Sequence, residues 1–215
     1  MKGYISLFKE KKVIFMIGLV CAAFNLVLSA MMIVGIPTII KVNLELSDTL
    51  YSYAQVSIGA GSLLGGILMG ALGKKFKIQS SYVLLLCSSL GLIPVAGVLM
   101  IDANKMIIYG VILVCCTVCI AVSTMFTIQA LTYLQQITPR HLVGKVIAVV
   151  MALCTISQPI GQAVYGIAFE KFDNYPELVI SVGILLATIL SIASRSVFIH
   201  IEEKSSQLTG SEQIA

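Results

Sequence analysis

Six long stretches without a charged residue constrain the fold of this chain more than any other feature of its sequence. They cover residues 13–40, 49–73, 78–101, 106–139, 146–169 and 178–194. A helix of about 20 apolar residues crosses a hydrocarbon core of roughly 30 Å, and each stretch is near or above that length. Soluble domains carry roughly 25% charged residues, whereas this chain carries 11%. The sequence therefore predicts an all-α membrane protein with six transmembrane helices.

The short loops between these stretches predict one bundle without an inserted soluble domain. We expect six spans within residues 1–201, and the polar residues 202–215 are predicted to form a disordered cytoplasmic tail. The spans are expected at about residues 13–40, 50–73, 79–101, 106–134, 145–169 and 178–200.

The distribution of basic residues predicts the orientation of the chain in the cell (inner) membrane. With the amino terminus inside, 11 of the 14 lysines and arginines lie on the cytoplasmic side. Because cytoplasmic loops are enriched in lysine and arginine, both termini are expected in the cytoplasm. The basic patches are interpreted as topology signals and contacts with the lipid bilayer, and no nucleic-acid partner is expected.

The sequence contains no motif for an enzyme or a cofactor. A phosphate-binding G-x-x-x-x-G-K-[ST] loop, a G-x-S-x-G elbow and an H-E-x-x-H pair are all absent. Cys116 and Cys119 have C-x-x-C spacing, which allows a metal or redox site, but no histidine or second cysteine pair accompanies them. Packing of small residues is the favoured interpretation, so no metal is expected.

Glycines are concentrated in the second span. The pairs Gly61/Gly65 and Gly66/Gly70 each have small-x-x-x-small spacing, which allows another helix backbone to approach closely. Tight helix packing alone would explain this pattern. A second interpretation comes from the residues that follow, because Gly73, Lys74 and Lys75 open a cytoplasmic loop directly after the span.

This segment resembles the G-x-x-x-D-R-x-G-R-R loop signature of the major facilitator superfamily, a family of secondary transporters. Gly66, Gly73, Lys74 and Lys75 fit the pattern, and Gly70 and Ala71 replace its Asp and Arg. The motif Gln158-Pro-Ile-Gly-Gln162 of the fifth span and the preceding loop at residues 135–146 are similar to bacterial drug and macrolide-type efflux members. The resemblance covers residues 5–200. It implies the C-terminal half of a 12-span fold, built as two three-helix inverted repeats.

Midspan amides suggest which residues face a substrate path, since a polar group in hydrocarbon needs a partner or a water-filled cavity. They occur only in spans one, two, four and five: Asn25, Gln55, Gln129, Gln158 and Gln162. Thr155, Gln158, Gln162 and Tyr165 recur at helical spacing and form a polar stripe. The resemblance implies that these spans line the path. Each amide alone is equally well explained as a hydrogen bond between helices.

Two functional hypotheses follow. The first is half of a secondary active transporter for efflux of a small amphipathic compound, which pairs with a first-half partner or forms a homodimer. The second is a non-transporting packing module or a remnant of a split transporter.

Overall fold

In the computed structural model, residues 2–73, 76, 78–101 and 103–212 are described, and side chains are described from residue 13 to residue 199. The described chain is helical throughout and contains no strand. Its elements are α1 (Lys2–Phe24), η1 (Asn25–Ser29), α2 (Ala30–Pro37), η2 (Thr38–Asn43), α3 (Asp48–Leu72), η4 (Ile78–Ser80), α4 (Ser81–Leu90), α5 (Ile93–Leu99), α6 (Lys105–Ile137), α7 (Val143–Lys171) and α8 (Pro176–Glu212).

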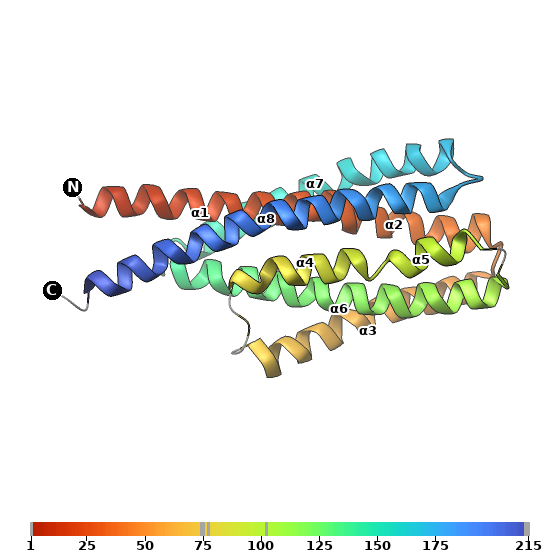
Figure 1. Ribbon diagram of the computed structural model, residues 1–215, viewed down its shortest axis with the longest axis horizontal. Helices are drawn as coiled ribbons and strands as arrows, with labels where there is room; N and C mark the ends of the chain where they lie inside the picture. The colour runs from red at the N-terminus through yellow and green to blue at the C-terminus, as the bar shows by residue number, and fades with distance from the viewer. Residues whose placement is uncertain (1, 74–75, 77, 102, 213–215) are drawn as a thin grey trace.

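Six helices in the described part are long and apolar enough to cross a membrane, which confirms the predicted multi-pass architecture. They are span 1 (Val13–Asn43), span 2 (Asp48–Leu72), span 3 (Ile78–Leu99), span 4 (Lys105–Ile137), span 5 (Val143–Lys171) and span 6 (Pro176–Ile199). Their ends lie within a few residues of the expected ones, because charged loop residues mark the limits of each apolar run. The start of α1 and the end of α8 lie at the same end of the bundle (Figure 1).

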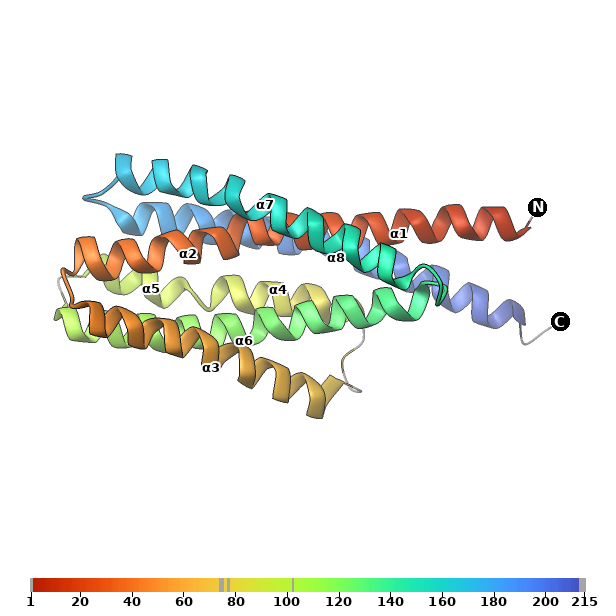
Figure 2. The ribbon, with the colours of Figure 1, turned by 180° about the vertical axis from the view of Figure 1, so that it is seen from behind.

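Neighbours in space are mostly not neighbours in sequence. Span 2 packs most extensively on span 4, span 3 packs on spans 4 and 6, and span 1 packs on span 5. Figure 1 looks onto α4, α5 and α8, which form spans 3 and 6. Figure 2, seen from behind, looks onto α7 and α3, which form spans 5 and 2. Spans 3 and 6 therefore cover one face of the bundle, and spans 2 and 5 flank the other.

Aromatic and sulfur-containing side chains form the centre of the bundle. The rings of Phe24 and Phe126 have centroids 5.9 Å apart, and Phe126 meets Phe198 edge to face at 6.3 Å. These rings join spans 1, 4 and 6. The Sγ atom of Cys119 lies 3.6 Å from the Sδ atom of Met32, which adds a second contact between spans 1 and 4. This contact agrees with a packing role for Cys119.

Two of the spans are not continuous α-helices. Span 3 is interrupted between α4 and α5, where Pro94 lacks the backbone N–H that an unbroken helix would use. Span 1 contains two π-helical turns, η1 and η2, and the second directly follows Pro37. The amide of Asn25 donates a hydrogen bond to the carbonyl oxygen of Cys21 at 2.9 Å, at the start of the first π turn. Hydropathy alone does not reveal such interruptions.

The backbone of α8 continues as a helix to Glu212. The described part of the predicted disordered tail, residues 202–212, is thus helical, and residues 213–215 lie outside the described chain. Residues 202–208 contain glutamate, lysine, glutamine and leucine, which have good helix propensity, and a helix already formed in the membrane can extend without a new nucleation step.

Candidate functional site

Spans 2 and 5 form the open face of the bundle. In their most apolar windows only 17% and 6% of the residues are buried, whereas the other four spans have 33–44%. Large side chains of these two helices, such as Leu63 and Ile156, are exposed. These two helices are therefore the ones that the rest of the described chain covers least.

The glycines of α3 have two different environments, although their spacing is the same. A Cβ atom at Gly61 would lie 2.5 Å from the carbonyl oxygen of Thr117, and one at Gly65 would overlap the carbonyl oxygen of Ala121. These two glycines permit backbone contact between α3 and α6, as predicted. A Cβ atom at Gly66 or Gly70 would meet nothing within 4 Å. For this second pair, the predicted close approach of another helix is wrong within the described chain.

The predicted loop motif comprises Gly66, Gly70, Gly73, Lys74 and Lys75, and the structure describes only its glycines. Gly66 and Gly70 lie on the outward flank of α3, and a Cβ at Gly73 would contact only the side chain of Met69 in its own helix. Lys74 and Lys75 lie outside the described residues.

The polar stripe of span 5 runs along the edge of its contact with span 1. Thr155 is exposed, Gln158 and Gln162 are half-buried, and Tyr165 is buried. A Cβ atom at Gly183 would lie 3.1 Å from the hydroxyl of Tyr165, so the ring packs against α8. The four residues share one helix face, but Tyr165 belongs to the packed interior and only the first three reach the open face.

The remaining amides lie apart from one another. Asn25 is half-buried in η1, which packs on α7, so it lies on the helix next to the stripe. Gln55 is exposed near the start of α3, and Gln129 is buried in α6. Asn25 thus lies on a helix that packs on the helix of Gln158 and Gln162, and its amide bonds within its own helix to Cys21. Gln129 is part of the core, which agrees with the interpretation of that amide as a packing group.

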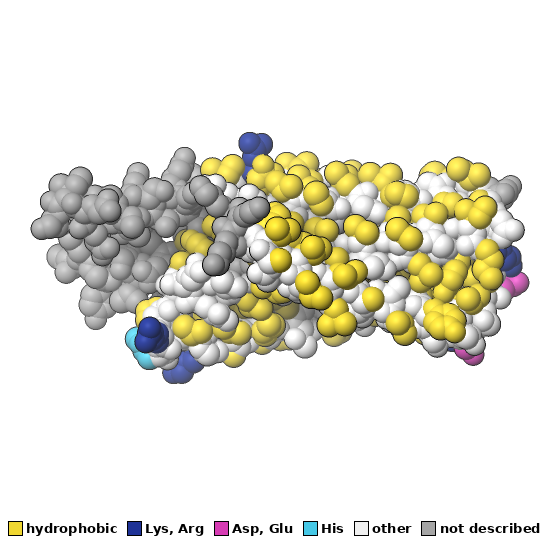
Figure 3. Space-filling view, turned by 90° about the horizontal axis from the view of Figure 1, so that it is seen from below, with side chains coloured by type: hydrophobic (Ala, Val, Ile, Leu, Met, Phe, Trp, Pro, Cys, Tyr) yellow, Lys and Arg dark blue, Asp and Glu magenta, His cyan; other side chains and the backbone are white. Residues whose placement is uncertain are grey.

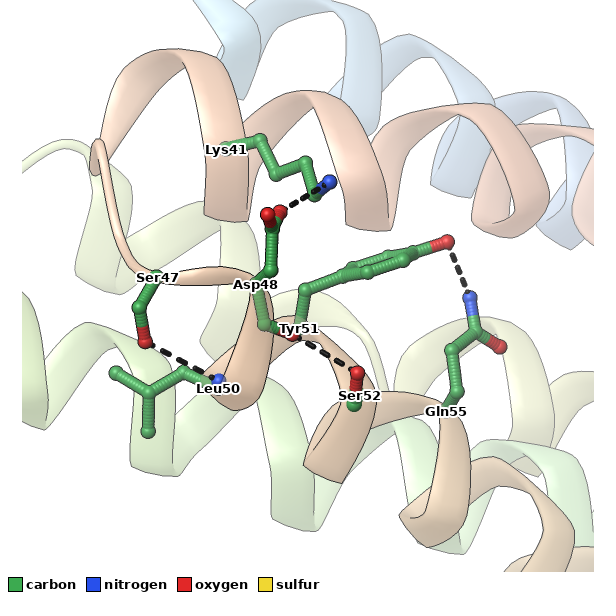
Figure 4. Close-up of polar contacts among 7 residues, drawn as sticks. All are labelled: Lys41, Ser47, Asp48, Leu50, Tyr51, Ser52 and Gln55. Carbon is green, nitrogen blue, oxygen red and sulfur yellow. Dashed lines mark hydrogen bonds and ion pairs between the residues drawn. The ribbon is translucent and has the colours of Figure 1, made fainter.

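A polar cluster that the sequence did not single out lies at the end opposite the termini (Figure 4). Lys41 Nζ lies 2.5 Å from an Asp48 carboxylate oxygen and 4.9 Å from the centroid of the Tyr51 ring. The Tyr51 hydroxyl accepts a hydrogen bond from the Gln55 amide at 2.7 Å. The i, i+4 spacing of Tyr51 and Gln55 was the signal in the sequence. Lys41, Asp48, Tyr51 and Gln55 therefore form one polar group at this rim of the bundle, which we call the rim cluster.

Two further contacts join the loops at this end. Lys105 Nζ lies 3.5 Å from Glu45 Oε2, and the Asn43 amide donates to the carbonyl oxygen of Asp173 at 2.7 Å. Glu45 has a backbone φ of 53°, in the left-handed region that favours glycine. The contacts link the ends of spans 1, 4 and 5 through polar groups outside the apolar core.

No match to this chain is found among protein-family models, curated proteins or solved structures.

Proposed function

We propose that this chain is half of a secondary active transporter of the major facilitator type, which exports a small amphipathic compound. It would form one wall of the translocation path and would pair with a first-half partner or a second copy. The observation that carries this proposal is the repeated way in which spans 2 and 5 pack against spans 4 and 1.

The most extensive contacts are kept when each span is exchanged with the one three positions away. The contact between spans 1 and 5 becomes the contact between spans 4 and 2, and the pair of spans 3 and 6 exchanges with itself. Because three spans is an odd number, the second three begin on the opposite side of the membrane. This pattern is what two inverted three-helix repeats would produce, and it supports the proposed arrangement.

Glycines make the two equivalent contacts. Gly61 and Gly65 of span 2 meet the backbone of Thr117 and Ala121, which are four residues apart in span 4. Gly161 of span 5 meets Leu26 and Ala30, which are four residues apart in span 1. Glycine contacts at corresponding places in spans 2 and 5 favour a repeated architecture over a bundle without an internal repeat.

The proposed orientation rests on the whole sequence, in which 11 of the 14 lysines and arginines lie on the side of the termini. The described basic side chains are divided equally, with Arg140, Lys145 and Arg195 towards the termini and Lys41, Lys105 and Lys171 towards the other end. We expect both termini in the cytoplasm.

Impermeant thiol labelling tests this orientation, with single cysteines at Phe76 and Asp173 in a background without the native cysteines. From outside intact cells, the cysteine at 173 should be labelled, and the cysteine at 76 only after permeabilisation. The reverse pattern would show that the chain is inserted the other way.

Water access to the open face tests the path itself. We expect Thr155→Cys to react with a charged thiol reagent at least about tenfold faster than Ile189→Cys, since a thiol in hydrocarbon does not form the reactive thiolate. Ile189 is a matched control because it is 54% exposed and lies midway along span 6, on the opposite face. Equal, slow reaction at both positions would favour the non-transporting packing module.

A further inference from the structure

Three basic side chains lie within six residues where α6 connects to α7. Arg140 and His141 are in the loop and Lys145 is in the first turn of α7, and all three are exposed. In Figure 3 the described histidine and neighbouring Lys and Arg side chains gather at one corner of the molecule. This corner lies at the end that carries the termini.

No described acidic side chain lies near this group. The described carboxylates are at the opposite end, where two of them pair with Lys41 and Lys105. Figure 3 shows acidic side chains beside basic ones only at that opposite end. The positive charges of Arg140 and Lys145 repel one another, and a bound anion would offset that repulsion. The described surface supplies no such anion at this corner.

The depth of the group is fixed by the helices on either side. Lys145 directly precedes the uncharged stretch of residues 146–169, so it lies where hydrocarbon gives way to headgroups. On the other side α6 ends at Ile137, and the backbone N–H of Leu142 donates to the carbonyl oxygen of Pro139 at 2.8 Å. This compact loop keeps Arg140 and His141 at the same level. We therefore expect the three side chains at the level of the lipid phosphates.

We propose that Arg140, His141 and Lys145 bind the phosphate of an anionic phospholipid in the leaflet at the terminal end. The Arg140 guanidinium can donate two hydrogen bonds to phosphate oxygens, and Lys145 adds a compact positive charge. A Cβ atom at Gly144 would meet nothing within 4 Å, so a headgroup can approach the start of α7. This site is independent of the transport proposal.

Native mass spectrometry of the purified full chain with phosphatidylglycerol or phosphatidylcholine tests the site. We expect phosphatidylglycerol to be retained by the wild-type chain and its affinity to fall roughly 5-fold for each charge removed in Arg140→Gln and Lys145→Gln. The matched control is the double variant Lys105→Gln with Lys171→Gln, which removes two charges at the other end and should leave retention unchanged. Arg140→Lys keeps the charge but loses the paired hydrogen bonds, so its affinity should lie between those of the wild type and Arg140→Gln, which keeps the test informative even if the neutral variants fold poorly.

Three results would overturn this proposal. One is unchanged phosphatidylglycerol affinity when Arg140 and Lys145 are both neutral. Another is an equal loss in the control variant, which would indicate attraction to net charge alone. The third is displacement of the lipid by millimolar inorganic phosphate, which would identify a free anion as the ligand.

Discussion

Replacing Gly65 with alanine is expected to destabilise the protein by roughly 2–3 kcal/mol, although the change adds a single methyl group. The methyl group would overlap the carbonyl oxygen of Ala121, and that oxygen belongs to a helix backbone that cannot rotate away. Helices α3 and α6 would have to separate, which loses contacts along the largest interface between two helices in the chain. Unfolding by titration with sodium dodecyl sulfate in mixed micelles measures the change.

The neighbouring Gly66→Ala is the matched control, because a Cβ there meets nothing within 4 Å. It should stabilise the protein by up to about 1 kcal/mol through the higher helix propensity of alanine. In span 5, Gly161→Ala and Gly166→Ala form a second pair with the same expected signs, since Gly161 contacts Leu26 and Ala30 and Gly166 contacts nothing. Equal effects within either pair would contradict the close helix contacts and remove the main support for a repeated architecture.

The spans were predictable from the sequence because the cost of a charge in hydrocarbon is large and leaves a clear pattern. Which glycines contact a neighbour was not predictable, because Gly61/Gly65 and Gly66/Gly70 have the same spacing. Only the position of α6 against one flank of α3 distinguishes them. Glycine spacing shows that a helix has a surface without side chains. The tertiary structure decides which of two such surfaces contacts another helix.

The candidate path residues show the same limit. Gln129 has the same chemistry as Gln158, but its helix α6 is apolar on all sides, so the amide could not be assigned to a face from the sequence. The structure places Gln129 in the core and leaves Gln158 half-buried at an edge. By contrast, the stripe from Thr155 to Tyr165 was correctly placed on one helix face. Which residues of the stripe are exposed and which are buried could not be predicted. It depends on the close contact of span 5 with span 1 at Gly161.

The last prediction concerns energy coupling. Proton-driven transport generally needs a titratable group within the membrane whose access alternates, and such groups are costly there unless function requires them. The carboxylates nearest the span ends include Glu45 and Asp48, which are exposed and paired with Lys105 and Lys41 at the rim. Amides and hydroxyls on the open face, such as Gln158 and Thr155, can bind a substrate but do not titrate at physiological pH.

We therefore expect that these 215 residues alone will not drive uphill movement, and that a partner half would supply any proton coupling. Proteoliposomes containing the purified chain, with and without an imposed pH gradient, measure this with a fluorescent amphipathic cation such as ethidium. The expected result is the same internal concentration in both cases. Gradient-dependent accumulation that an uncoupler abolishes would mean that the rim carboxylates take part in coupling, and Glu45→Gln and Asp48→Asn would then identify which one is required.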